Sequence, residues 1–600
     1  MSAGLPPPNR NGLWARLAVE ELLRLGAGPF IIAPGSRSSP LALAAFDLAS
    51  SSIVHWDERG CGFLASGWAR SSGKPPVVIT TSGTAVANLF PAVVEASMEH
   101  LPLILLTADR PPELRETGAN QTIDQARIFG TYVRWFCDLG PPDIATPPSQ
   151  VLSVVDHAMW MATGRTPGPV HVNIAFREPL APVPVEDGTA EAWENLSAWR
   201  SQTGPLVRHA PSRFAPSERE ARSLAARLSA EERGVIVAGG GLSLAARSAL
   251  LKAAVALNWP ILPDVTSGLR LVDHPWVIHY ADAMGCGGFF DDHLPRAILH
   301  AGGRMTSKRI TAFLNRSGAP LHVLVGRHGH RIDPERGIHE CIDADPEWIE
   351  NLLGIWEEQG PCPDTPERMG AWTRSWSRAN RQAGDILDEN LGPGAVLSEP
   401  GVARIVSSEI PHDHVLFLGS SMPVRDMDLA GVPGSSAWTA ANRGASGIDG
   451  TVASAIGFAN GAGAKLTLVL GDLALLHDLN SLALAGRLPQ GGVIVVVNNN
   501  GGGIFHFLPV AEPTERFETL FGTPHGRTFR SAADLFSLPY HLATDPDSFR
   551  SAYRSAAAGR AWTLIEVQTN REANLQLHRD LTTALARCGS SASDAPAFPS

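Results

Sequence analysis

Two apolar runs in the last third of the chain end in residues that can bind a metal ion and phosphate. The run at 466–470 is followed by Asp472, and the run at 493–497 is followed by Asn499 and a glycine-rich turn that contains Gly501. Both runs are predicted to be buried parallel strands, so the polar residues would lie at strand carboxyl ends, where α/β sheets bind ligands. A carboxylate, an amide oxygen and a glycine carbonyl are ligands that Mg²⁺ prefers, and open positions would remain for phosphate oxygens.

A turn without a ligand is the alternative for Asp472, because Gly-Asp is common after a strand. The three asparagines and three glycines at 498–503 do not fit that alternative, because side-chain amides need partners and consecutive glycines weaken local structure. The spacing of Asp472 and Asn499 resembles the signature of thiamine diphosphate-dependent enzymes, Gly-Asp followed somewhat under thirty residues later by Asn-Asn. The resemblance implies bound thiamine diphosphate, with Mg²⁺ or alternatively Mn²⁺ held by Asp472, Asn499 and the Gly501 carbonyl. Leu473 departs from the pattern, because most of that superfamily has a second glycine there.

Such a cofactor needs a carboxylate that faces its pyrimidine ring, and Glu58 is the candidate. It precedes a helix of small residues predicted at 62–69. An exposed acid favoured by the helix dipole is the alternative. By position, Glu58 resembles the catalytic glutamate of thiamine diphosphate enzymes, which acts on the aminopyrimidine so that the thiazolium carbon loses its proton. This general-base work depends on geometry and a tuned pKa.

Further motifs narrow the resemblance to the MenD family of menaquinone biosynthesis. They occur in the family's order over about residues 9–576, at 33–41, 57–59, 81–85, 106–111, 118–121, 302–304 and 442–450, together with Lys308, Ser421 and Arg425. Several motifs in the same order indicate the MenD family far more specifically than any one motif does. Leu473 also fits the MenD branch of the thiamine diphosphate enzymes. The resemblance implies a transferase that joins 2-oxoglutarate to isochorismate by 1,4-addition with loss of carbon dioxide, giving 2-succinyl-5-enolpyruvyl-6-hydroxy-3-cyclohexene-1-carboxylate.

The same resemblance nominates the binding residues. For the cofactor they are Glu58, Ser421, Ile448, Asp472, Leu473, Asn499, Gly501 and Gly502. For the substrates they are Ser36, Arg37, Arg110, Gln121, Lys308, Ser421, Arg425, Arg443, Ile504, Phe505 and Leu508. Cations must converge in a sheltered site, because a hydrogen bond to a charged group there contributes roughly 1.5 to 3 kcal/mol and an exposed ion pair only about 0 to 1 kcal/mol. For each of these substrate residues the alternative is a surface cation or an ordinary core side chain.

Isochorismate and 2-oxoglutarate carry two carboxylates each, and one carboxylate of the oxoacid leaves as carbon dioxide. The remaining carboxylates suggest two groups of cations, one for each substrate. We hypothesise that Arg425 and Arg443 bind the carboxylate that remains on the oxoacid. Arg37, Arg110 and Lys308 would then bind isochorismate. Under this hypothesis, weakening one group should damage one stage of the reaction.

Length and composition agree with this reading without making it more specific. A formal charge of −11 argues against a nucleic-acid partner, and 600 residues with 44% hydrophobic content provide for several cores. Six scattered cysteines form no Cys-x-x-Cys pair, which favours free thiols in a reducing cytoplasm. Because the chain shows no signal-peptide pattern and no apolar stretch of about 18 residues, we expect a cytoplasmic protein without a membrane span.

Alternating strand and helix patterns predict an α/β fold of three doubly wound domains with parallel sheets. The predicted division is a pyrimidine-binding domain at 1–185, a linker at 186–215, a central α/β domain at 216–360, a linker at 361–384, a diphosphate-binding domain at 385–585 and a disordered tail at 586–600. Strands are expected at 30–33, 77–80, 103–107, 235–238, 260–263, 322–325, 415–418, 466–470, 493–497 and 564–567. The glycines at 239–241 lack a complete G-x-G-x-x-G, which favours a tight turn over a dinucleotide loop.

We expect the chain to form a homo-oligomer, and two other functions are alternatives to the one described. In the resembled family, residues equivalent to Glu58 and Asp472 meet across a subunit interface, which implies a homodimer or homotetramer. The nearer alternative function is another thiamine diphosphate enzyme, such as an acetohydroxyacid synthase or a 2-oxoacid decarboxylase; the arginine-rich motifs argue against it. The second is an inactive binding protein on the same scaffold, and the intact Glu58, Asp472 and Asn499 argue against that.

Overall fold

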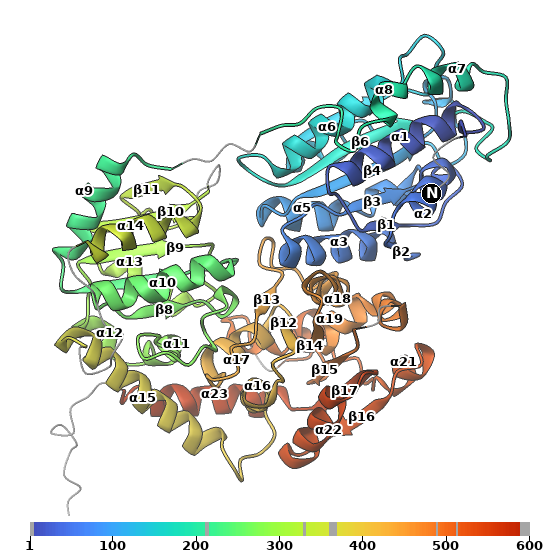
Figure 1. Cartoon of the computed structure of the whole chain (residues 1–600). Coiled ribbons are helices and arrows are strands. Elements are labelled where there is room, and N and C mark those ends of the chain that lie inside the picture. Colours follow the sequence, from blue (N-terminus) through green and yellow to red (C-terminus); the bar gives the residue numbers. More distant parts are fainter. Residues whose placement is uncertain are drawn as a thin grey trace, which may run out of the picture. The chain divides into compact units, whose positions relative to one another are not determined.

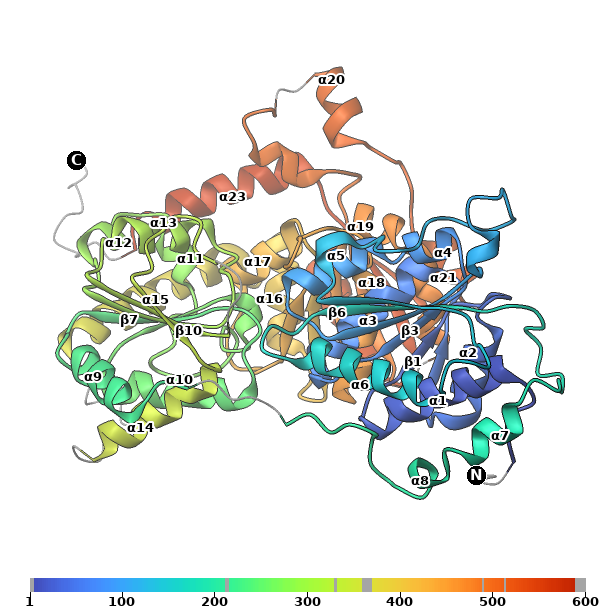
Figure 2. The same cartoon turned by 90° about the horizontal axis from the view of Figure 1, so that it is seen from above.

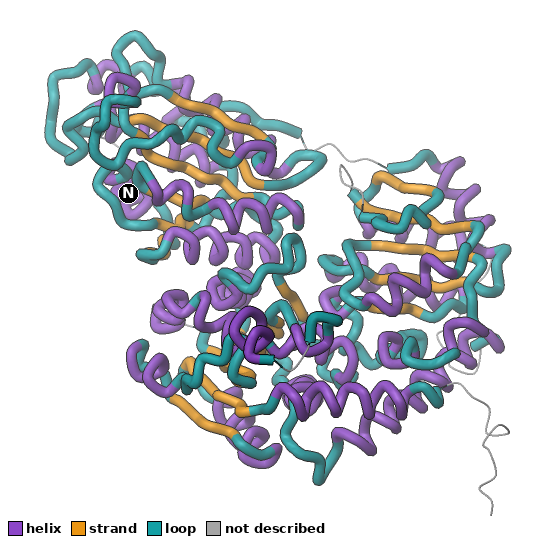
Figure 3. Tube along the Cα trace, turned by 180° about the vertical axis from the view of Figure 1, so that it is seen from behind, coloured by secondary structure: helices purple, strands orange, loops and turns teal. Residues whose placement is uncertain are grey.

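Three parallel sheets enclosed by helices organise the chain (Figures 1 and 3). The structure is a computed structural model, and it describes residues 5–210, 215–327, 332–358, 369–487, 490–511 and 514–588. Contacts divide the chain into two compact units, the first of residues 1–212, 442–464 and 477–490 and the second of residues 213–441, 465–476 and 491–600. The sheets confirm the predicted α/β fold. The domain boundaries stay predictions, and residues 589–600 of the expected tail lie outside the described residues.

The first sheet has the strand order β2-β1-β3-β4-β6-β5. Its strands are β1 (Phe30–Ile32), β2 (Ser52–Val54), β3 (Val77–Thr80), β4 (Leu103–Asp109), β5 (Trp135–Leu139) and β6 (Pro169–Ala175). Helices α1 (Arg10–Arg24), α2 (Ser39–Leu48) and α6 (Ser149–Thr163) cover one face, and α3 (Glu58–Ser72), α4 (Thr84–Ala87) and α5 (Phe90–Met98) lie on the other (Figure 2). All seven residues of β4 are buried, as expected for a central parallel strand.

The segment at 186–215, expected as a linker, contains two short helices, α7 (Thr189–Glu194) and α8 (Ser197–Arg200). Their indole side chains, Trp193 and Trp199, are buried in the core of the first sheet. The Arg24 guanidinium lies 3.9 Å from the Trp199 ring centroid. The tryptophans therefore fasten this segment to the first domain.

The second sheet has the order β11-β10-β9-β7-β8. Its strands are β7 (Gly234–Ala238), β8 (Ile261–Pro263), β9 (Ala297–Ala301), β10 (Leu321–Gly326) and β11 (Glu340–Asp343). One core lies under α9 (Glu218–Ser229), α10 (Leu244–Leu257) and α14 (Ile349–Glu357), and a second lies under α11 (Ala281–Met284), α12 (Phe289–Asp292), α13 (Lys308–Arg316) and α15 (Ala371–Leu391). Helix α15 takes up most of the expected linker at 361–384, of which 361–368 lie outside the described residues.

The glycines at 239–241 are explained by a close approach of two backbone turns. A Cβ at Gly239 would lie 2.0 Å from the Gly303 carbonyl oxygen, and the Gly303 N–H donates to the Gly240 carbonyl at 2.8 Å. This packing supports the tight turn over the dinucleotide loop.

The third sheet has the order β13-β12-β14-β15-β17-β16. Its strands are β12 (His414–Leu418), β13 (Thr439–Ala441), β14 (Lys465–Gly471), β15 (Gly492–Asn498), β16 (Tyr540–Ala543) and β17 (Trp562–Gln568). The remaining helices are α16 (Glu399–Glu409), α17 (Met422–Ala430), α18 (Thr451–Ala462), α19 (Asp472–His477), α20 (Glu515–Phe517), α21 (Arg530–Leu535), α22 (Pro546–Ala558) and α23 (Arg571–Leu585). Short helical turns lie at η6 (Leu479–Arg487), η7 (Gly503–Phe507) and η8 (Glu518–Gly522). In the described part of the chain, no helix combines the length and the apolar character that a membrane crossing requires.

Candidate active site

The carboxyl ends of β14 and β15 lie side by side, because the two strands pair in the third sheet. Asp472 is buried directly after β14; its Oδ1 accepts the Leu473 N–H at 2.7 Å, and its Oδ2 accepts the Gly501 N–H at 2.8 Å. The structure thus brings Asp472 and the glycine turn together. An unpredicted residue, His525, places Nε2 3.0 Å from the same Oδ2.

Each of the three asparagines after β15 has different partners. Asn498 Nδ2 donates to the buried carboxylate of Glu566 at 2.7 Å. Asn499 Nδ2 donates to Glu399 Oε1 at 2.8 Å. Asn500 Oδ1 accepts the backbone N–H of His525 at 3.0 Å and of the following glycine at 2.7 Å. The last two bonds hold the loop that brings His525 to Asp472.

The glycines are required because the turn at 501–503 packs against the backbone at 521–522. Gly501 has a φ of +133°, and a Cβ there would lie 2.0 Å from the Gly522 carbonyl oxygen. A Cβ at Gly502 would lie 2.3 Å from the Phe521 carbonyl oxygen. Residues with side chains would therefore move this turn away from Asp472.

The donor set at this edge fits a divalent metal ion. Asn499 Oδ1 is buried and has no hydrogen-bond partner among the described residues. An orphaned buried amide oxygen is costly unless a donor or a cation faces it. The Gly501 carbonyl accepts the Gly503 N–H at 2.9 Å and keeps a second lone pair. Carboxylate, amide and carbonyl oxygens are the ligands of a Mg²⁺ site that also binds phosphates.

Behind Asn499 lies a group of buried charges that includes Glu399 and Asp426. Burial, and next the negative charge of Asp426, raise the pKa of Glu399 to about 8. His578 Nε2 lies 2.9 Å from Asp426 Oδ1. Burial opposes protonation of His578, but the close negative charge of Asp426 prevails and raises the pKa of His578. The Asn499 amide is thus backed by acids held away from water.

Glu58 is the first residue of α3, where Asp57 caps the helix by accepting the Gly60 N–H. Its half-buried carboxylate accepts Asn88 Nδ2 at 3.1 Å through Oε2. His55 is fully buried nearby, and burial lowers its pKa to about 4. The cap and the Asn88 amide together orient the Glu58 side chain.

The segment that contains Ile448 is fixed to the helices around Glu58 within the first unit. Glu95 on α5 accepts the Gly444 N–H at 3.0 Å and the Ala445 N–H at 2.7 Å. The half-buried Ile448 lies just before α18, and its carbonyl accepts Thr451 Oγ1 at 2.9 Å. Helix α18 packs closely on α3.

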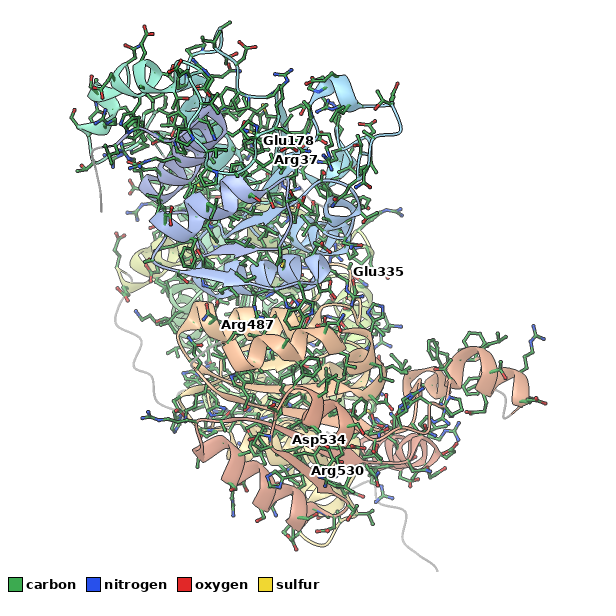
Figure 4. The ribbon with its side chains drawn as sticks, turned by 90° about the vertical axis from the view of Figure 1, so that its right-hand side faces the viewer. Arg37, Glu178, Glu335, Arg487, Arg530 and Asp534 are labelled. Carbon is green, nitrogen blue, oxygen red and sulfur yellow. The ribbon has the colours of Figure 1, made fainter. Side chains whose placement is uncertain are left out.

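Two predicted substrate arginines in the first unit differ in their contacts. Arg37 is buried; its Nη1 donates to the Phe176 carbonyl at 2.8 Å, and its Nη2 pairs with Glu178 Oε1 at 3.1 Å (Figure 4). The half-buried Arg110 has a buried Nε without a hydrogen-bond partner among the described residues. Its backbone N–H donates to Asp109 Oδ1 at 2.7 Å.

The predicted residues in the third domain begin with Ser421, whose φ is +75° at the start of α17. Arg425 donates to the Ser421 carbonyl, so these two are brought together. Lys308 belongs instead to the predicted central domain, where it is exposed at the start of α13. Arg443 is half-buried and belongs to the first unit, with Glu58 and Ile448. Ser421 and Arg425 belong to the second unit, with Asp472 and Asn499.

The neutral and apolar candidates are more exposed. Gln121 has a φ of +55° and donates through Nε2 to the Ser82 carbonyl at 3.0 Å, while Ser36 is exposed. Ile504 and Phe505 are half-buried, Phe505 packs against Phe521 at 5.6 Å between ring centroids, and Leu508 is 43% exposed.

Two residues that contact Asp472 and Asn499 were not predicted from the sequence. Glu399 follows a serine and precedes a proline, a helix-start pattern that marks the start of α16 but not a site. His525 lies in a loop and reaches Asp472 only through the folded chain. Neither carried a sequence signal for metal chemistry.

Comparison with known proteins identifies the family of this chain. A family model described as "Thiamine pyrophosphate enzyme, N-terminal TPP binding domain" matches residues 14–128, and one described as "Middle domain of thiamine pyrophosphate" matches residues 190–418. A 2-succinyl-5-enolpyruvyl-6-hydroxy-3-cyclohexene-1-carboxylate synthase of Rubrobacter xylanophilus is 47% identical over 584 residues, which cover 96% of this chain and 99% of that protein.

Two further relatives carry the same name. The protein of Salinibacter ruber is 44% identical over 97% of this chain and 98% of its own length. That of Chlorobium phaeobacteroides is 42% identical over 96% of this chain and 97% of its own length. Such identity over nearly the whole length confirms the resemblance read from the motifs. The chain therefore belongs to the 2-succinyl-5-enolpyruvyl-6-hydroxy-3-cyclohexene-1-carboxylate synthase family of thiamine diphosphate-dependent enzymes.

Proposed function

We propose that this enzyme, which joins 2-oxoglutarate to isochorismate with loss of carbon dioxide, holds a divalent metal ion with Asp472, Asn499 and the Gly501 carbonyl. The observation that carries the proposal is the buried Asn499 Oδ1, which has no hydrogen-bond partner among the described residues. The metal ion, Mg²⁺ or Mn²⁺, would neutralise and position the cofactor's diphosphate. When bound, thiamine diphosphate supplies the electron sink that lets carbon dioxide leave.

Glu58 is proposed as the catalytic residue toward the aminopyrimidine ring. Its place at the start of α3 and the hydrogen bond from Asn88 support this role, because both fix a half-buried carboxylate in one orientation. Within the first unit, Ile448 is held by the segment that Glu95 binds, and we propose that it supports the bent cofactor. Ser421, Leu473 and Gly502 would complete the cofactor contacts.

The cations are proposed to bind the substrate carboxylates in two groups. Arg110 suits isochorismate because the N–H of its buried Nε donates to no acceptor among the described residues. At Arg37, a substrate carboxylate would replace Glu178, whose side chain is 69% exposed. Lys308 would add a third charge to this group. Arg425, tied to Ser421, and Arg443 would bind the oxoacid. Ser36 and Gln121 would donate hydrogen bonds to the substrates, and Ile504, Phe505 and Leu508 would wall the site and exclude water.

The test is to incubate the purified chain with thiamine diphosphate, Mg²⁺, 2-oxoglutarate and isochorismate and to identify the product by mass. We expect the joined product and one carbon dioxide per turnover. Asp472→Ala should lose cofactor binding in calorimetry, whereas Asp413→Ala, which removes an exposed carboxylate paired with Lys465 at the other end of the strands, should keep it. Full activity in chelator-treated, cofactor-free protein would refute the metal site.

The assembly rests on the family resemblance, and the location rests on the six scattered cysteines, which form no Cys-x-x-Cys pair. We propose a homodimer or homotetramer that acts in the cytoplasm. Sedimentation at several concentrations, with and without the cofactor, distinguishes these two states from a monomer.

A further inference from the structure

The side-chain amide of Asn499 has two distinct ends, and they meet different surroundings. Its Nδ2 donates to Glu399 Oε1 at 2.8 Å. Its Oδ1 is buried and without a hydrogen-bond partner among the described residues. A metal ion binds only the oxygen end, so the amide must not rotate by half a turn.

Glu399 selects the orientation that leaves the oxygen free. Oε1 of Glu399 accepts the amide NH₂, and a carboxyl oxygen without a proton only accepts hydrogen bonds. This oxygen therefore attracts the NH₂ end and repels the amide oxygen, also when Oε2 carries the proton that burial favours. Gly503 leaves room for the same end, because a Cβ there would lie 2.6 Å from Asn499 Nδ2. The amide therefore has a close neighbour and a specific acceptor on its nitrogen side.

Glu399 is itself firmly placed. It is 5% exposed and is the first residue of α16, where Ser398 caps the helix by accepting the Gly401 N–H. A helix N-terminus stabilises a negative charge, and Pro400 suits the first helical turn. The carboxylate thus reaches Asn499 from a rigid element, which a precise site requires.

We propose that Glu399 is a positioning residue of the metal site: its carboxylate holds the Asn499 amide with Oδ1 toward the cation. The inference rests on the proposed metal site and adds a residue that does not itself touch the metal ion. Partners that orient metal ligands commonly change metal affinity by about 10- to 100-fold when they are replaced.

Glu399→Gln tests the role, because a glutamine can offer Asn499 either a donor or an acceptor and so permits both amide orientations. With thiamine diphosphate at saturation, free Mn²⁺ measured by electron paramagnetic resonance should show about 10- to 100-fold weaker binding. At saturating Mn²⁺, kcat should return close to that of the unchanged enzyme. Glu409→Gln is the matched control on the same helix; it removes the partner of Arg550 and Arg554, so it should lower thermal stability but not Mn²⁺ affinity.

The same substitution in an Asn499→Asp variant distinguishes an effect on amide orientation from a general loss of structure. In Asn499→Asp both side-chain ends are oxygens, so orientation no longer matters, and the new carboxylate faces Glu399 with like charge. Adding Glu399→Gln there should strengthen Mn²⁺ binding instead of weakening it. Equal losses in both backgrounds, or normal Mn²⁺ binding in Glu399→Gln alone, would overturn the role of Glu399. If the unchanged enzyme itself bound no Mn²⁺ in the presence of the cofactor, the metal site would fall and this role with it.

Discussion

Three consecutive asparagines after β15 have different partners, and the difference decides which of them can bind a metal ion. Asn498 uses both ends of its amide, donating to Glu566 and accepting the Asn500 N–H at 3.1 Å. Asn500 Oδ1 accepts two backbone N–H groups. Among the three, only Asn499 keeps a buried oxygen without a hydrogen bond in the described residues. The local geometry thus singles out the residue that the spacing from Asp472 nominated.

Replacing Glu58 by glutamine tests the proposed proton chemistry at a single residue. The variant keeps the size and the hydrogen bond to Asn88 but loses the titratable carboxyl group. We expect the cofactor to bind while turnover falls by about 10²- to 10⁴-fold. Hydrogen–deuterium exchange at the thiazolium carbon, followed by NMR, should slow. Glu113→Gln, at an exposed ion pair with Arg177, is the control; an unchanged exchange rate in Glu58→Gln contradicts the assignment.

The two groups of cations predict two different kinetic defects. Arg110→Ala should still decarboxylate 2-oxoglutarate and release succinic semialdehyde. The activation free energy of the joining step should rise by about 1.5 to 3 kcal/mol or more, so that this step becomes slower. Arg425→Ala should slow decarboxylation instead. Single-turnover experiments in which isochorismate is added after carbon dioxide release can time both steps. The grouping is wrong if Arg110→Ala delays carbon dioxide release and leaves joining untouched.

At the scale of elements, glycines let α3 and α18 approach closely. A Cβ at Gly67 would lie 1.9 Å from the Ser454 carbonyl oxygen, and one at Gly457 would lie 2.0 Å from that of Leu64. The N-terminus of α3 presents Glu58, and Ile448 lies just before α18, so this contact sets the distance between two proposed cofactor residues. A backbone oxygen cannot move aside as a flexible side chain can.

Gly457→Ala should therefore force the two helices apart. Overpacking of this kind costs about 1 to 3 kcal/mol of unfolding free energy, and denaturant titration should detect it. Calorimetry should also show weaker cofactor binding. Gly486→Ala is the control in the same unit, because its Cβ would meet no heavy atom within 4 Å. Equal stability of both variants would show that the close contact is unimportant.

Most central strands were predictable from the sequence and most edge strands were not, although β8 at an edge was predicted and the buried β9 was missed. The runs at 77–80, 466–470 and 493–497 coincide with β3, β14 and β15, because strands covered on both faces are apolar throughout. The edge strands β5 and β16 were missed, since exposure makes their sequences mixed. The same logic applies to the site. Asp472 and Asn499 follow strands and could be found, whereas Glu399 and His525 arrive through tertiary packing, which no local pattern records.

At the scale of the whole molecule, two buried titratable groups, His171 and Asp478, change the free energy of unfolding in opposite directions as the pH falls. Burial lowers the pKa of His171 to about 3, against the opposing charge of Asp138, so below about pH 6.5 the unfolded chain takes up this proton and the folded chain does not. Stability from this group is full above pH 6.5 and falls as the pH falls. Burial raises the pKa of Asp478 to about 6, so between about pH 6 and 3.8 only the folded chain is protonated there, and stability from this group rises as the pH falls.

Two variants in the first unit should reveal these opposite signs. His171→Gln lacks the group that the unfolded state protonates, so its stability relative to the unchanged protein should rise by up to about 1.4 kcal/mol per pH unit as the pH falls below 6.5. Any loss of its hydrogen bond to Thr107 is present at every pH and does not alter the slope. Asp478→Asn has no buried carboxylate to ionise, so its relative stability should fall between about pH 6 and 4. Urea unfolding at pH 7.5, 6 and 4.5 measures both slopes. If the unfolding free energy of both variants changed with pH in parallel with that of the unchanged protein, neither group would titrate as its burial requires.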